Sequence, residues 1–128
     1  MQAIRYYGNT KEERIKPMFD NIDNMARIER EIEKRMEAAC EKNGWYVAVA
    51  MMPPETTTLH IEKFGEKPIV GEDAQAALDS AVAFAKAEFG TTATVERFDE
   101  KIPNTRAPYH IRLRLKVDAS KRVQELAA

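Results

Sequence analysis

The stretch Tyr109-His-Ile-Arg-Leu-Arg-Leu-Lys-Val117 decides the fold. Along it, apolar and polar residues alternate without a break. Its apolar members are Ile111, Leu113, Leu115 and Val117, and its polar members are His110, Arg112, Arg114 and Lys116. Successive side chains of a strand point to opposite faces, so this period of two predicts a strand that is buried on one side only. We expect its apolar face to lie under helices and its basic face to be open.

Three further segments outside this stretch have strand character. Residues 45–51 place Trp45, Val47, Val49 and Met51 on one face, residues 58–64 place Leu59 and Ile61 inward, and residues 92–98 place Ala93 and Val95 inward. Residues 1–7 are a weaker candidate for an additional strand. The paired prolines at 53–54 cannot continue a central strand, so they predict a turn between the first two segments.

Two long helices and one short helix are expected. The first runs over about residues 17–43, with Pro17 in its first turn and Gly44 as its stop. Its apolar stripe is Met18, Ile22, Met25, Ile32, Met36 and Ala39, and Glu29 is the one position that interrupts the series. The second runs over 72–89 and ends at Gly90, with a buried stripe predicted at Leu78, Ala81, Val82, Ala85 and Phe89. Asp118 can cap a final helix over 119–126.

These elements predict one α+β domain over residues 1–128. The order helix–strand–strand occurs twice and is followed by the short C-terminal helix. It favours an antiparallel sheet of four or five strands with the two main helices on one face and the other face open. A helix of about 27 residues is roughly 40 Å long, whereas a six-residue strand covers about 20 Å. We therefore expect the N-terminal part of the long helix, about residues 17–28, to overhang the sheet as an association element.

Composition restricts the class of protein. The chain has 128 residues, 44% hydrophobic and 32% charged, which is typical of a soluble globular protein. No apolar run approaches the ~20 residues of a membrane-spanning helix, and the N-terminus lacks the pattern of a signal peptide. The single cysteine, Cys40, excludes an intramolecular disulfide and a cysteine-based metal cage. These features favour the cytoplasm, no membrane partner and no cofactor.

A histidine-based site is the first chemical hypothesis for the open face. His60 and Glu62 point to the same side of one predicted strand, and His110 points the same way from another. Such a group could bind zinc or transfer protons. No metal-binding spacing supports it, and the sequence has neither a nucleophile motif nor a phosphate-binding loop. A small enzyme is therefore our third hypothesis.

A basic row supplies the second hypothesis, binding of nucleic acid. Its members are Tyr109, His110, Arg112, Arg114 and Lys116, with Lys101 and Arg106 in the preceding segment. Cations in a row can follow phosphates, but sheets that bind single strands also need aromatic platforms. Glu62 and Glu96 share this face and would pair with the arginines.

The leading hypothesis is a non-catalytic, self-associating module that binds another macromolecule, most plausibly a protein. It rests on the open sheet face, on the absence of catalytic motifs and on the overhanging apolar stripe. Soluble proteins rarely expose large apolar patches, so a second copy should cover the stripe. The residues expected to form that homo-oligomer contact are Met18, Phe19, Ile22 and Met25.

Overall fold

The protein is an α+β domain built on one antiparallel sheet. The structure is a computed structural model; it describes the backbone of residues 11–51 and 53–127, and the side chains of residues 24–51 and 53–127. The elements of this part of the chain are α1 (Lys11–Cys40), β1 (Tyr46–Ala50), a 3-10 turn (Pro54–Thr56), β2 (Thr57–Gly65), α2 (Gly71–Phe89), β3 (Thr94–Lys101), β4 (Tyr109–Val117) and α3 (Ser120–Ala127). The predicted fold class is confirmed, whereas the strand expected over 1–7 lies outside the described residues.

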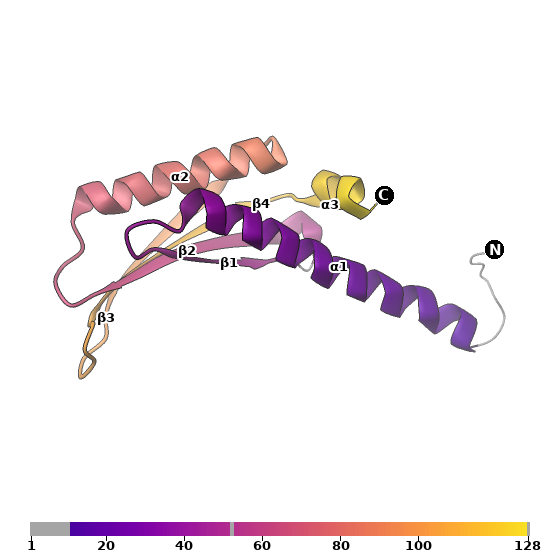
Figure 1. Cartoon of the computed structure of the whole chain (residues 1–128), viewed down its shortest axis with the longest axis horizontal. Coiled ribbons are helices and arrows are strands. Elements are labelled where there is room, and N and C mark those ends of the chain that lie inside the picture. The colour runs from indigo at the N-terminus through magenta and orange to yellow at the C-terminus, as the bar shows by residue number, and fades with distance from the viewer. Residues whose placement is uncertain (1–10, 52, 128) are drawn as a thin grey trace.

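The sheet has the strand order β1-β2-β4-β3, and every neighbouring pair is antiparallel. Its registers join odd-numbered residues to odd-numbered ones, for example Val49 to Leu59 and Ile61 to Leu113. Cross-strand partners share a face, so all odd-numbered strand residues point to one side of the sheet, the inner face. The helices lie on this side (Figure 1).

The core lies between the inner face and the two long helices. α1 contributes Ile28, Ile32 and Met36. The buried strand residues include Val49, Leu59, Ile61, Ile111, Leu113, Leu115 and Val117, as their alternation predicts. Trp45 and Cys40 are buried as well, and burial raises the pKa of the Cys40 thiol. The cysteine is therefore a small core residue rather than an activated nucleophile.

Helix boundaries differ from the prediction mainly at α1. This helix begins at Lys11 and continues through Pro17, so the predicted start at Pro17 is wrong. Proline removes one backbone hydrogen bond, and a long helix can tolerate that loss. α2 ends as expected at Gly90, whose φ of 69° is left-handed. Of its predicted buried stripe, Ala81, Ala85 and Phe89 are buried and Leu78 packs against the core, whereas Val82 is exposed. Phe84, which was not predicted, is buried as well.

The predicted overhang of α1 is shorter than residues 17–28. Figure 1 shows the N-terminal part of α1 running beyond the end of the sheet. Ile28 is fully buried, Met25 packs against the core, and Arg27 donates to the Leu126 carbonyl of α3 at 3.3 Å. Residues 25–28 therefore lie on the domain, because the C-terminal helix extends the surface that α1 covers.

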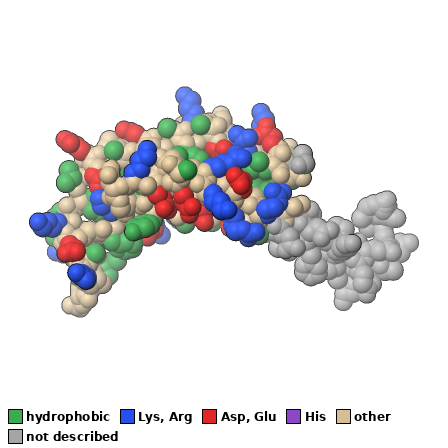
Figure 2. Space-filling view, in the orientation of Figure 1, with side chains coloured by type: hydrophobic (Ala, Val, Ile, Leu, Met, Phe, Trp, Pro, Cys, Tyr) green, Lys and Arg blue, Asp and Glu red, His purple; other side chains and the backbone are tan. Residues whose placement is uncertain are grey.

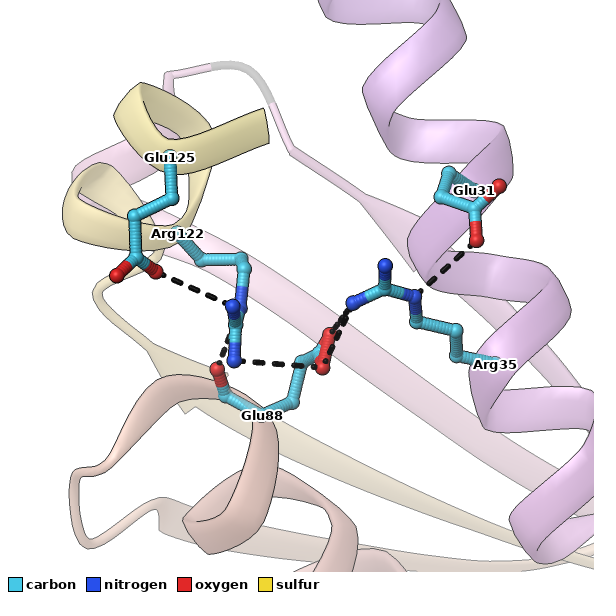
Figure 3. Close-up of polar contacts among 5 residues, drawn as sticks. All are labelled: Glu31, Arg35, Glu88, Arg122 and Glu125. Carbon is cyan, nitrogen blue, oxygen red and sulfur yellow. Dashed lines mark hydrogen bonds and ion pairs between the residues drawn. The ribbon is translucent and has the colours of Figure 1, made fainter. Parts of the chain in front are cut away.

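One polar network joins the three helices (Figure 3). Arg35 of α1 pairs with Glu31 at 3.1 Å and with Glu88 of α2 at 2.9 Å. Arg122 of α3 donates to the Glu88 backbone carbonyl at 2.9 Å and pairs with Glu125 at 3.2 Å. Glu88 is thus held by arginines from two other helices, which fixes the helical layer above the sheet.

Candidate functional site

The outer face of the sheet carries the even-numbered strand residues, and it is the candidate site. Its geometry follows from the strand order, which places β4 in the interior between β2 and β3. Read across β2, β4 and β3, its four rows are Phe64–His110–Glu100, Glu62–Arg112–Phe98, His60–Arg114–Glu96 and Thr58–Lys116–Thr94. β1 adds Tyr46, Ala48 and Ala50 beside Glu62, His60 and Thr58.

Aromatic rings on the outer face lie against cations or imidazole. Arg112 and Arg114 place their guanidinium carbons 4.7 and 5.2 Å from the ring centre of Phe98. Phe64 and His110 are stacked with ring centres 4.2 Å apart and planes within 1° of parallel. Tyr46 and Phe64 are 61% and 44% exposed, so part of this aromatic surface is free for contact.

Glu96 pairs with two cations of the outer face. Glu96 accepts a hydrogen bond from Arg114 Nε at 2.8 Å and forms ion pairs with Arg114 Nη2 at 2.7 Å and Lys116 Nζ at 3.6 Å. The hydrogen bond from Arg114 lowers the pKa of the Glu96 carboxyl. Arg112, Arg114 and Lys116 are matched in number by Glu62, Glu96 and Glu100. The face is therefore close to neutral, rather than a cationic track.

Two buried polar groups of the outer face lack hydrogen bonds within the described part of the chain. They are both ring nitrogens of His110, whose side chain is 10% exposed, and Nε of Arg112. His110 Nε2 lies 3.5 Å from a Glu62 oxygen, but in an orientation that makes no hydrogen bond. Because an unsatisfied buried polar atom is costly, these two groups are a local cost of the fold, and the buried atoms are not accessible to a molecule on the surface.

The histidine hypothesis receives limited support from the geometry. His110 lies beside Glu62, but His60 faces Ala48 and Arg114 instead. Burial, with smaller effects of Arg112 and Arg114, lowers the pKa of His60. Within residues 24–51 and 53–127, no group of three His, Cys, Asp or Glu side chains could hold a metal ion.

The predicted basic row is only partly assembled. His110, Arg112, Arg114 and Lys116 share the outer face as expected. Tyr109 and Lys101 do not join them, because their odd positions point to the inner face, where Lys101 Nζ lies 5.3 Å from the Tyr109 ring centre. Arg106 lies in the loop between β3 and β4. Alternation along a strand separates Tyr109 and Lys101 from the row, and Arg106 is outside both strands.

The predicted self-association residues are mostly outside the described side chains. Met18, Phe19 and Ile22 belong to α1, but only their backbone is described. Met25 is half-buried and packs against the core of its own domain. Part of the Met25 side chain stays exposed, so self-association through these four residues stays a prediction.

A row of three glutamates, two on α1 and one immediately after its last residue, is not predicted from the sequence. Glu29, Glu33 and Glu41 accept hydrogen bonds from the backbone N–H groups of Met51, Val49 and Val47, each at 2.9 Å. Figure 2 shows acidic side chains gathered where α1 runs along β1. Part of the signal is present in the spacing, since a step of four places Glu29 and Glu33 on one helix face, and Glu29 interrupts the apolar stripe.

None of the described helices is long and apolar enough to cross a membrane. No family model, no curated protein and no solved structure matches the chain.

Proposed function

We propose that the protein is a non-catalytic interaction module whose outer sheet face binds another protein. The observation that carries the proposal is the composition of this face. It combines the exposed rings of Tyr46 and Phe64 with the two arginines at Phe98, and its charges balance. Aromatic residues and arginine are enriched at protein–protein interfaces and supply most of their hot spots.

The charge pattern favours a protein over a nucleic acid. Binding to phosphates needs cations that are free to replace counterions. Here Glu96 holds Arg114 and is close to Lys116, and bringing a phosphate to this row would place it next to glutamates. A protein partner with both acidic and basic groups at its rim suits such a surface better.

The test is capture of partners from cell extract with matched variants of the full chain. Tyr46→Ala and Phe64→Ala remove outer-face contact area, whereas Val82→Ala removes an exposed side chain from α2 on the opposite side of the sheet. Quantitative mass spectrometry should find a protein that the wild type and Val82→Ala retain and that both outer-face variants lose. Titration of the purified partner should then show a dissociation constant raised about tenfold or more, since a hot-spot residue contributes over 1 kcal/mol.

Two results would contradict the proposal. One is a partner that all three variants retain equally, which would place the contact elsewhere. The other is tight binding of single-stranded oligonucleotide that weakens steeply with salt and is lost in Arg112→Ala, which would support the nucleic-acid alternative.

A further inference from the structure

The two edges of the sheet differ in how their backbone groups are satisfied. At the β1 edge, the carboxylates of Glu29, Glu33 and Glu41 accept the N–H groups of alternate residues from Val47 to Met51. An unpaired edge is a template for another strand. With these donors occupied by glutamates of α1 and of the segment that follows it, the N–H groups of β1 are not available to another strand.

β3 forms the opposite edge, and its outward backbone groups can be assigned. The Ile102 N–H donates to the Pro108 carbonyl at 2.7 Å, and the register from β3 to β4 continues from this pair without a bulge. In an antiparallel ladder, hydrogen-bonded pairs recur at every second residue. Even-numbered β3 residues therefore bond to β4. The backbone groups of Val95, Arg97, Asp99 and Lys101 point to an edge that no other described strand occupies.

The inner side of β3 is also left largely open. Val95 is 38% exposed, and beyond it Arg97 and Asp99 point inward as an ion pair of 2.7 Å with both side chains exposed. In Figure 1 the β3–β4 hairpin extends away from the helices. Inward charges often protect an edge against unspecific pairing. An inward pair of opposite sign can in addition select a strand of complementary sign.

We propose that β3 pairs antiparallel with β3 of a second copy, with the two-fold axis passing beside Phe98. Arg97 then lies opposite Asp99 of the second copy, Asp99 lies opposite its Arg97, and Val95 lies opposite its Lys101. These odd-numbered pairs are the hydrogen-bonded ones, which matches the outward backbone groups. Phe98 and its symmetry mate form the adjacent non-bonded pair, where side chains approach most closely.

The two registers centred on the neighbouring residues Arg97 and Asp99 are less favourable. For the helices of both copies to lie on the same side of the joined sheet, cross-strand partners must share a face. Odd-numbered residues must therefore lie opposite odd-numbered residues, and even-numbered residues opposite even-numbered ones. Centring the pair on Arg97 places two arginines opposite each other, and centring it on Asp99 opposes two aspartates and sets Arg97 against Lys101. The Phe98 register opposes Glu96 and Glu100, but Glu96 is already paired with Arg114 and Lys116.

The assembly would join two four-stranded sheets into one of eight strands, with both outer faces continuous across the axis. It does not depend on which molecule the outer face binds. It also differs from association through the N-terminal part of α1, because the contact lies at the other edge of the sheet.

Charge reversal tests the pairing in the full chain. Sedimentation equilibrium should give a dimer for the wild type at micromolar concentration. Arg97→Asp and Asp99→Arg each place like charges opposite each other, and should raise the dimer dissociation constant about tenfold or more. The double variant Arg97→Asp/Asp99→Arg restores both cross-copy pairs and should recover most of the affinity. Lys86→Asp on α2 is the matched control and should leave the dissociation constant unchanged.

Backbone and register are tested separately. Arg97→Pro removes an outward N–H without touching the bonds to β4, so it should give a folded monomer by circular dichroism. Phe98→Cys should form a disulfide-linked dimer under mild oxidation, because the two Cβ atoms would be about 5 Å apart. Glu96→Cys should not, since its symmetry mate would be about 13 Å away along the strands.

A wild type that stays monomeric at 100 μM (about a hundred times micromolar dissociation constants) overturns the proposal. So does a dimer that survives Arg97→Asp, Asp99→Arg and Arg97→Pro alike, or one that cross-links through Glu96→Cys rather than Phe98→Cys. Should Arg97→Pro fail to fold, the charge-reversal series still decides.

Discussion

The side chain of Glu33 on α1 accepts a hydrogen bond from the backbone N–H of Val49 on β1 at 2.9 Å. Glu29 and Glu41 make the same kind of contact with the neighbouring alternate N–H groups of this strand. An acidic helix side chain thus takes the place of a fifth strand. The row keeps α1 in register with the sheet and closes one of its two edges.

Replacing Glu33 should therefore be costly for a residue that lies on a charged helix face. Glu33→Ala leaves the N–H of the buried Val49 without a protein acceptor, and should lower the free energy of unfolding by about 1–3 kcal/mol. Glu37→Ala, on an exposed position of the same helix, should change it by less than about 0.5 kcal/mol. Urea melts of the two variants make the comparison, and equal effects would show that the contact does not stabilise the fold.

The assignment of the two sheet faces is tested by neighbouring residues of β4. Leu113 is 1% exposed, so Leu113→Ala should create a cavity and cost roughly 2–5 kcal/mol. Arg114 lies on the outer face and loses its pair with Glu96 on replacement by alanine, which should cost under about 1 kcal/mol. Denaturant unfolding decides between them. A larger loss for Arg114→Ala would mean that the faces are reversed.

Asp73 should make stability depend on acid pH. It accepts from Lys63 Nζ at 2.6 Å and from Trp45 Nε1 at 3.1 Å, and the bond from Lys63 lowers the pKa of its carboxyl. The pKa of Asp73 is lower in the folded state than its unfolded value of about 3.9. The ionised carboxyl therefore contributes its full stabilisation of the fold at pH values above about 3.9. It is lost as pH falls through the folded value.

Asp73→Asn should accordingly lower stability at pH 7 by about 1–3 kcal/mol, because two bonds to a charged acceptor weaken. The wild type and the variant should converge as pH falls below about 4. Thermal melts between pH 2 and 7 (about two units below to three above the reference pKa) measure this. A constant difference across the range would exclude linkage through Asp73.

His60 should make the stability of the fold depend on pH nearer to neutrality than Asp73 does. Burial lowers its pKa, and the charges of Arg112 and Arg114 lower it further. Its folded-state pKa is below the unfolded value of about 6.5, so stability is complete above that value and falls as pH decreases toward the folded pKa. NMR titration should find the His60 pKa below that of a model peptide, and Arg112→Ala should raise it. A His60 pKa that Arg112→Ala leaves unchanged would contradict this electrostatic effect.

Much of the fold was predictable because it depends on neighbouring residues in the chain. The alternation from His110 to Val117 assigned these eight side chains of β4 to their faces, and Gly90 marked the end of α2. Both signals are local: a strand exposes alternate side chains, and a left-handed stop favours glycine. The start of α1 was missed because Pro17 was taken as a boundary, although a helix of this length can continue through it.

The strand order, and with it the candidate site, was decided by tertiary structure alone. Alternation places Arg112 and Arg114 on the outer face, but it cannot say that Phe98 lies between them or that Glu96 takes up the charge of Arg114. The same holds for Glu33 at the edge of β1. Periodicity records only which side of a strand or helix a residue occupies. Which strands become neighbours depends on how the whole chain packs its core, and that packing is a property of distant residues together.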